Sequence, residues 1–248
     1  MTSVPSTPAS HTPADTFITT RWTRVLAARG DSPEARQALS DLCAAYYAPV
    51  VAFLRRQRQD EDAARELAHE FFARVLERQS FGGADPERGR FRSYLLGALK
   101  HFLANRHVHA QREKRGGGAP HETLAGATDT SPGPAIADPS TPSPDAVFDR
   151  EWAVSVLERA FAILSREAEQ AGTQREFETL KPWLTGVSRG RTHADAARQL
   201  GMNEGAVRVA VHRLRRRFRE TVKAEIAQTV NEPSEVADEL RHLIQVLS

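Results

Sequence analysis

The sequence predicts an all-α fold with two helical domains joined by a flexible Pro/Gly-rich linker, the second domain carrying a helix-turn-helix. Two observations lead to this prediction. Apolar residues recur every three to four positions on both sides of residues 116–146, and no run alternates β-branched and polar residues between hairpin turns. Residues 116–146 hold five glycines and six prolines but no Lys or Arg, so they bury too little apolar surface to offset their ordering entropy.

These patterns divide the chain into five segments. Residues 1–15 are rich in Ser, Thr and Pro and are expected to form a disordered tail. The first domain spans 16–115, the linker 116–146 and the second domain 147–228, and an amphipathic C-terminal helix occupies 229–248. We expect the two domains to fold separately.

Helix start and stop signals place the elements of the first half. Helices are expected at 17–29 and, after the Ser32-Pro33-Glu34 start signal, to about Tyr47. A third helix carries the apolar residues of 50–54, and Pro49 either begins it or kinks the one before. Asp60 caps a fourth helix that ends at 81–83, and a long helix follows at 90–114.

The second half shows the same apolar spacing. It predicts helices near 145–171, 174–185, 192–200, 204–228 and 234–247. In the last of these, five apolar residues share one face: Val236, Leu240, Leu243, Ile244 and Leu247. This helix either docks on its own second domain, or binds a regulator or shields the helix that precedes it.

Composition limits the class of protein. The chain has 248 residues and a net charge of +2, and no stretch approaches 18 consecutive apolar residues, so no membrane-spanning helix is expected. Cys43 is the single cysteine and excludes an internal disulfide. The N-terminal residues lack the basic start and apolar centre of a secretory signal. These features are typical of a cytoplasmic protein.

The strongest local signal lies at 192–220. Thr192 and Asp195 resemble a capping box, Gly201 suits the left-handed end of a helix, and Asn203 can cap the next one. Two helices joined by so short a turn form a helix-turn-helix.

The second of these helices has a basic outer face. At 100° per residue, its apolar seam comprises Val207, Val211, Leu214 and Phe218. The opposite face comprises Gly205, Val209, His212 and Arg216, flanked by Arg208, Arg213 and Arg219. Residues 186–223 hold ten Lys and Arg against three acids, which favours binding to the major groove of DNA over a merely solvated helix face. Val209 is either a contact to a thymine methyl or an incidental exposed residue.

A second basic stretch lies at 88–115, with eight Lys and Arg, one acid and interleaved aromatic residues. This pattern is typical of proteins that bind single-stranded nucleic acid. Phe91 and Phe102 share a stripe with Leu95 and Ala98 and are expected to pack in the core. The candidate nucleic-acid contacts are Arg92, Lys100, Asn105, Arg106 and Arg112, with Tyr94 at the edge of the apolar stripe. His107 and His109 point about 200° apart, so no metal site is expected.

Three stretches together resemble the bacterial RNA polymerase sigma factors of the extracytoplasmic-function group. They are AARELAHEFFARVL at 63–76, FRSYLLGALKHFLANRHVHAQREKR at 91–115, and the helix-turn-helix of 192–219. The resemblance covers about 17–115 and 145–228. It implies a region-2 domain that binds core polymerase and opens the −10 promoter element, and a region-4 domain that reads the −35 element as duplex.

The resemblance also assigns roles by position. Polymerase binding would fall to Glu66, Leu67, Glu70 and Phe71. Contacts to the opened −10 element would come from Arg92, Tyr94, Lys100, Asn105, Arg106 and Arg112. Contacts to the −35 element would come from Thr192, Asn203, Glu204, Gly205, Arg208, Val209, His212, Arg213 and Arg216. The chain departs from the family pattern at Ala63, Arg65 and His69, which alters the charge balance of the polymerase-docking helix.

The expected function is therefore that of a non-enzymatic sigma factor whose partners are core RNA polymerase and promoter DNA, with an anti-sigma factor or other regulator as a further candidate. No cofactor, metal or membrane is expected to take part. The alternative is a two-domain helix-turn-helix regulator that acts without polymerase. An enzyme acting on nucleic acid is disfavoured, because the sequence shows no phosphate-binding Gly-rich loop, metal-ligand cluster or nucleophile with a matched base.

Overall fold

A computed structural model describes residues 21, 32–57, 60–77, 90–114, 142–186 and 190–248, with side chains left out at 110–114. Its helices are α2 (Pro33–Arg56), α3 (Glu61–Glu77), α4 (Phe91–Lys114), α5 (Pro144–Gln170), α6 (Gln174–Leu180), the short 3₁₀ helix η2 (Lys181–Trp183), α7 (His193–Leu200), α8 (Glu204–Ala227) and α9 (Glu235–Leu247). Within these ranges there is no β-strand, and the predicted all-α class is confirmed.

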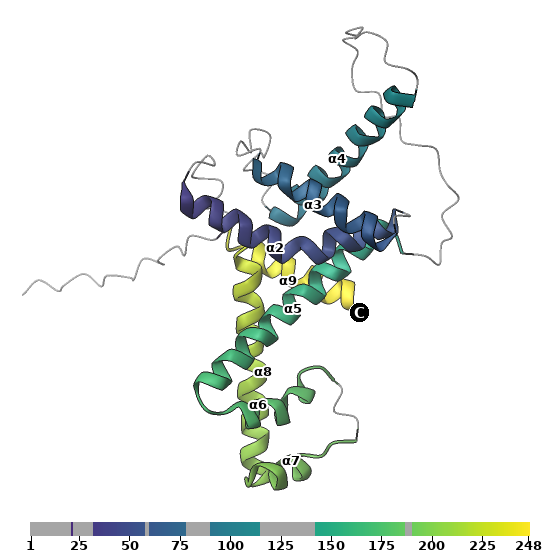
Figure 1. The fold of residues 1–248 in the computed structure, drawn as a ribbon. Helices are drawn as coiled ribbons and strands as arrows, with labels where there is room; N and C mark the ends of the chain where they lie inside the picture. The colour runs from purple at the N-terminus through teal and green to yellow at the C-terminus, as the bar shows by residue number, and fades with distance from the viewer. Residues whose placement is uncertain (1–20, 22–31, 58–59, 78–89, 115–141, 187–189) are drawn as a thin grey trace, which may run out of the picture.

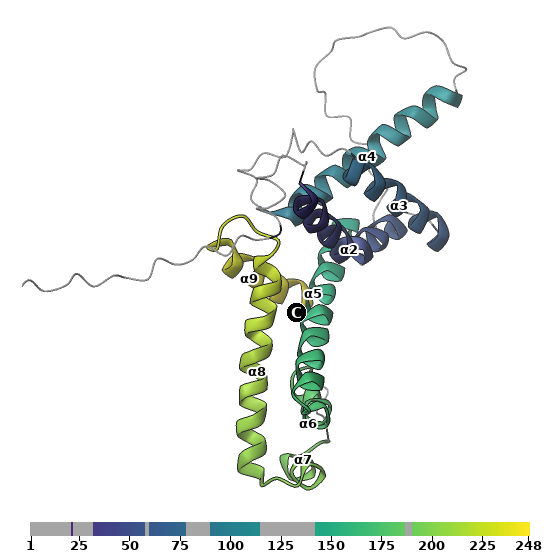
Figure 2. The ribbon, with the colours of Figure 1, turned by 60° about the vertical axis from the view of Figure 1, so that its left-hand side comes forward.

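The two longest helices of the second half, α5 and α8, lie side by side and form a stem (Figures 1 and 2). One end of the stem packs with α2 and α9, and α3 and α4 lie beyond α2. The opposite end carries α6 and α7. The C-terminal part of α4 projects away from the body in both views, and every side chain from Ala104 to His109 is exposed.

The predicted helix starts are present with the expected capping bonds. The Ala35 N–H donates to Ser32 Oγ over 3.1 Å, and the Ala63 N–H donates to Asp60 Oδ1 over 2.8 Å. Ser143 caps α5 in the same way, and Pro144 stands in the first turn, where its missing N–H costs nothing. Residues 144–146 therefore belong to a helix and not to the predicted linker.

One element differs from its prediction. Residues 33–56 form a single helix, α2, although two were expected, and Pro49 lies buried inside it. Proline within a helix leaves the carbonyl four residues earlier without its usual N–H partner. Here that carbonyl belongs to Ala45, and Arg159 Nη1 of α5 donates to it over 3.1 Å. A side chain from the second half thus supplies the hydrogen bond that Pro49 cannot.

The two halves share one hydrophobic core, which differs from the expected pair of separately folded domains. Tyr46 and Phe91 of the first half and Phe148 and Trp152 of the second are fully buried in the same cluster. The centroid of the Tyr46 ring lies 5.1 Å from that of Phe91, with the rings edge to face, and 6.4 Å from that of Phe148. Because α5 is apolar along the face that meets α2, burial of that face joins the halves.

A smaller core holds the far end of the stem. Leu180 and Trp183 pack there against the alanines of α7 and against Val207 and Val211 of α8. Leu214 lies half buried at its edge, and Phe218 packs half buried against Leu164 and Phe177 nearby, so the predicted apolar seam of α8 faces inward as expected.

By length and composition α2 could cross a membrane, and it is the one helix in the described part of the chain that passes this test. In the structure, 56% of its apolar stretch is buried inside the protein. The helix expected at 17–29, the tail at 1–15, the helix end at 81–83 and the linker up to residue 141 lie outside the described residues, apart from Arg21.

Candidate nucleic-acid interface

The turn between α7 and α8 has the expected geometry at each position. The Asp195 N–H donates to Thr192 Oγ1 over 3.1 Å, and the Thr192 N–H donates to Asp195 Oδ2 over 3.1 Å, which closes the capping box. Gly201 is left-handed at φ 67°, a conformation that suits glycine. Asn203 then accepts the Ala206 N–H over 2.8 Å and starts α8. The angle between the two helices is thus fixed at both ends of the turn.

The pKa of Asp195 is lowered, mainly by the hydrogen bond from the Thr192 hydroxyl, with the Thr192 N–H and Arg198 adding to the effect. The carboxylate is therefore ionised across the neutral range. Its charge also lies at the N-terminus of α7, where a negative charge interacts favourably with the helix dipole.

The outer face of α8 presents the residues that the sequence assigned to DNA. All nine candidates of the helix pair are exposed, and Val209 keeps 55% of its surface accessible. Arg208 and Arg216 contact only acids on their own helix, Glu204 at 3.3 Å and Glu220 at 3.0 Å. Such exposed pairs one turn apart contribute a few tenths of a kcal/mol at most, about 0.3–0.5. They leave the guanidinium groups available to a stronger anion.

Two other arginines of α8 hold the fold instead. Arg215 donates to the Trp183 carbonyl through Nη2 at 3.2 Å, and Arg217 forms an ion pair with Glu167 of α5. The hydrogen bond to Glu167 raises the pKa of Arg217. The helical projection left both out of the outer face, and the structure agrees with it.

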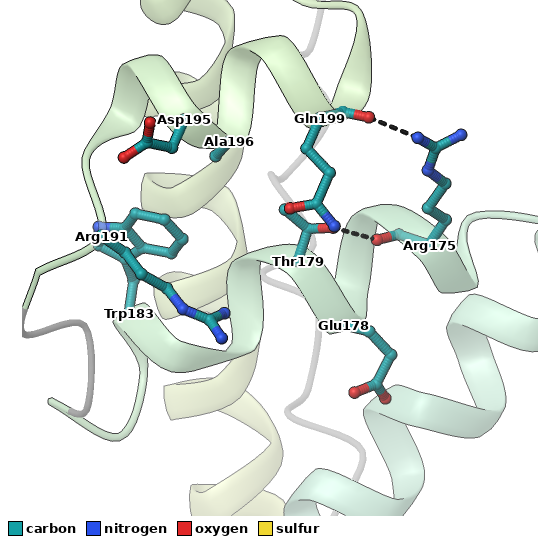
Figure 3. A pocket seen from close by; sticks show the side chains of 8 residues that line it. All are labelled: Arg175, Glu178, Thr179, Trp183, Arg191, Asp195, Ala196 and Gln199. Carbon is teal, nitrogen blue, oxygen red and sulfur yellow. Dashed lines mark hydrogen bonds between the residues drawn. The ribbon is translucent and has the colours of Figure 1, made fainter.

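An open pocket of about 510 Å³ lies between α6 and α7 (Figure 3). It is lined by Arg175, Glu178, Thr179, Trp183, Arg191, Asp195, Ala196 and Gln199. Arg175 Nη2 donates over 2.6 Å to the Gln199 carbonyl, in the last turn of α7, and Thr179 donates to the Arg175 carbonyl over 2.7 Å. The first bond joins α6 to α7 and the second lies within α6, so the polar groups of this pocket support the position of the helix pair.

The second basic stretch forms α4, and the predicted packing residues are confirmed: Phe91 is fully buried and Phe102 nearly so. Four candidate contacts lie at the surface or its edge. Asn105 is exposed; Lys100 and Arg106 are exposed but pair with Asp145 and Glu70; Tyr94 is half buried against the core. Arg112 has no described side chain.

Arg92 differs most from its expected role. Its side chain is only 11% exposed and lies against three groups of the second half. Nη1 donates to Asp149 over 2.5 Å, Nη2 to Glu239 over 3.1 Å, and the guanidinium lies 5.1 Å from the Trp152 ring centroid. Burial lowers the pKa of Arg92, but the bonds to Glu239 and the charge of Asp149 outweigh this and raise it. In this structure Arg92 is not accessible to a phosphate group.

The candidate polymerase-binding helix is α3, and its four residues divide into two pairs. Leu67 and Phe71 are buried in the core, at 7% and 2% exposure, so in this arrangement they support the helix and cannot touch a partner. Glu66 is exposed, and half-buried Glu70 accepts from both Arg74 and Arg106. The accessible part of this surface is therefore polar.

Sequence reasoning missed the acidic set that meets α4. Arg90 and Arg92 contact Glu235, Asp238 and Glu239 of α9, and Glu239 is buried at 1% exposure. The signal in the sequence was the spacing of these three acids on one side of a helix otherwise assigned only by its apolar face. A projection does not show where that helix docks.

Among the described residues, no group of three or more His, Cys, Asp or Glu side chains could hold a metal ion. Searches with this chain found no match among protein-family models, curated proteins or solved structures.

Proposed function

We propose that this chain is a sigma factor that binds core RNA polymerase and directs promoter recognition and DNA opening in the cytoplasm. The observation that carries the proposal is the outer face of α8, which presents exposed arginines on a helix whose start and inner seam are both fixed. The resemblance at 63–76, 91–115 and 192–219 selects this function among those open to a basic helix.

In this proposal α7 and α8 act as a helix-turn-helix. Its first helix is short, its turn is closed by Gly201 and Asn203, and the residues at the start of α8 face outward, where base edges would lie. Arg208, Arg213 and Arg216 lie on that outer face. Guanidinium groups on such a face can read guanine edges or bind phosphates.

The projecting part of α4 would take part in strand opening. Lys100, Asn105 and Arg106 lie on its exposed surface, and the three histidines of α4, His101, His107 and His109, are exposed as well. Cations that follow a backbone beside groups that stack on bases are what single-stranded binding requires. The second domain would position the complex on duplex, and this helix would capture the separated strand.

The test separates a sigma factor from a regulator that acts without polymerase. Immobilised core polymerase should retain the wild-type chain and lose the Glu66→Arg variant, because Glu66 is exposed on α3. Glu158→Arg reverses an exposed acid on α5 and serves as the matched control, which should bind like wild type. Glu70→Arg is less clean, since Glu70 holds two arginines of the fold.

If core polymerase does not retain the wild-type chain, the sigma proposal is wrong, and specific promoter binding without polymerase would then favour the alternative regulator. Turnover of DNA or nucleotide by the purified chain would indicate an enzyme instead. Transcription from a bound promoter by polymerase plus this chain, and not by polymerase alone, would support the proposal directly.

A further inference from the structure

The cations at the start of α4 all meet carboxylates of the second half of the chain. Arg90 lies within 3.5 Å of Glu235 and Asp238, and its Nη1 donates to Glu239 over 2.8 Å. Arg92 bonds to Asp149 and Glu239, and Lys100 Nζ lies 2.6 Å from Asp145. Five acids from α5 and α9 thus neutralise three cations: Arg90, which directly precedes α4, and Arg92 and Lys100 within it.

The side chains at the centre of this contact are largely shielded from solvent. Glu239 is 1% exposed and accepts from two guanidinium groups at once, while Arg92 lies over the Trp152 ring. His242 of α9 approaches Asp149, with its Nε2 3.2 Å from a carboxylate oxygen. Charge pairs shielded from water interact more strongly than the exposed pairs of α8. The backbone continues the contact, since the Phe91 N–H donates to the Thr229 carbonyl over 3.0 Å.

Carboxylate and phosphate compete for the same donors. A guanidinium group offers a planar set of N–H donors that fits either anion. In this structure the carboxylates of Asp149 and Glu239 occupy the donors of Arg92, so a nucleic-acid phosphate cannot reach them. Binding of a phosphate backbone at Arg90 and Arg92 and docking of α9 on them exclude each other.

The apolar contacts of α9 are made with the main core, on the side of α5 and α8. Leu243 is buried, and Val236, Leu240 and Val246 pack half buried against the main core. Of the predicted docking face, only Ile244 and Leu247 stay exposed, at 57% and 37%. The contacts that α9 makes with Arg90 and Arg92 are ion pairs, and a polyanion can replace ion pairs. The helix does not cover Arg208–Arg216, since it packs against α5 and the opposite end of α8 (Figure 2).

We propose that α9, together with the first turns of α5, is an autoinhibitory clasp: its carboxylates stand in for phosphates on Arg90 and Arg92 and mask both arginines. Opening of the clasp exposes these arginines to the backbone of single-stranded DNA. The inference rests on the proposed function, because it assigns regulation to the same basic helix.

The test compares variants of the full chain for binding to a fluorescein-labelled oligothymidylate by anisotropy. Glu239→Gln removes the buried charge, and the double variant Glu235→Gln/Asp238→Asn weakens the exposed rim without touching a buried residue. Glu167→Gln is the control, because it removes one acid of an ion pair far along the stem that does not contact α4. Both clasp variants should bind at least about fivefold tighter than wild type, and the control should not.

A second readout follows the docking of α9 itself and needs no nucleic acid. Dyes at Glu77→Cys on α3 and Gln245→Cys on α9 report the distance between α9 and the first half. Cys43 stays unlabelled because it is buried with its thiol pKa raised to about 12. The clasp variants should lower the energy transfer between the dyes, and oligothymidylate should lower it in the wild type.

The outcomes separate the clasp from the proposed function. Equal affinities for all variants, or an equal gain in the Glu167→Gln control, would overturn the clasp even if polymerase binding and promoter-directed transcription are intact. Unchanged energy transfer in the clasp variants would also overturn it. If the wild type binds neither polymerase nor promoter while the clasp variants still lower the energy transfer, the sigma function and the inhibitory role are both wrong. Control of α9 docking by its acids would then still stand.

Discussion

The two basic helices of this protein have similar charge and opposite surroundings. Residues 88–115, which contain α4, and residues 186–223, which contain most of α8, each carry a net charge of +7. At the start of α4 the arginines are matched by acids from α5 and α9, whereas on α8 the outer arginines meet only acids of their own helix. The same residue type is therefore structural in one place and accessible in the other.

This difference teaches that a basic helix is not by itself a nucleic-acid surface. Arg92 is buried, and its removal would take a guanidinium partner from both Asp149 and Glu239, so its first role in this structure is to join the halves. Arg208 and Arg213 lose little by exchanging water for a phosphate or a base. What decides between the two roles is the supply of buried acids nearby.

The largest effect is expected from breaking the shared core. Trp152→Ala removes a fully buried ring beneath Arg92, and core substitutions of this size cost about 3–5 kcal/mol in the free energy of unfolding. Urea unfolding followed on both halves should show one transition shifted as a whole. As a reference, Trp183→Ala lies in the smaller core at the far end of the stem. If α2–α4 unfold at an unchanged urea concentration in Trp152→Ala, the core does not couple the halves.

A direct comparison of the two helices uses one arginine from each. Arg92→Ala takes a buried guanidinium partner from two carboxylates, although Glu239 keeps Arg90, and should cost about 3 kcal/mol of stability. Arg216→Ala breaks only an exposed pair with Glu220 and should stay within about 0.5 kcal/mol of wild type. Calorimetry or urea unfolding measures both. Equal costs would show that burial does not distinguish the two arginines.

DNA binding should reverse that order. Arg208→Ala and Arg213→Ala should each weaken promoter binding by about 1–3 kcal/mol for every base that the arginine reads, with little change in stability. The exposed Arg198 of α7 provides the control, because it pairs locally with Asp195. Competition between promoter and unrelated duplex measures the effect. An equal weakening on all sequences would make the residue a phosphate contact and not a reader of bases.

The smallest effect concerns the capping box. Thr192→Ala removes the hydroxyl that caps α7 and should cost about 1 kcal/mol. Because Thr192 holds the pKa of Asp195 below its usual 3.8, the Asp195 contribution is present at neutral pH and is lost as the pH falls through the lowered value. The stability difference between wild type and Asp195→Asn should therefore shrink in strong acid. A difference that persists there would contradict this account.

Much of the fold followed from local rules. Ser32, Asp60, Thr192 and Asn203 each cap the helix that they were expected to cap, and Gly201 is left-handed. These features depend on a few neighbouring residues, so the sequence is sufficient to predict them. Pro49 is the exception, because its place inside α2 depends on an arginine more than a hundred positions away that bonds to the Ala45 carbonyl.

The candidate sites divide in the same way. The helical projection of α8 separated Arg208, Arg213 and Arg216 on the outer face from Arg215 and Arg217, which are also exposed but bond to η2 and α5. On α4 the same reasoning found the buried Phe91 and Phe102 but counted Arg92 as exposed. A projection gives the direction of a side chain relative to its own helix, and the acids that neutralise Arg92 belong to helices that a projection does not place.

The sequence by itself determined the all-α class, the helix ends that local capping bonds fix, and the outward face of α8. Only the tertiary structure decided that α5 joins both halves in one core and that α9 places its acids on Arg90 and Arg92. The physical reason is range. Caps and helix faces depend on residues a few positions apart, whereas the pairing of distant charges depends on which apolar faces bury each other.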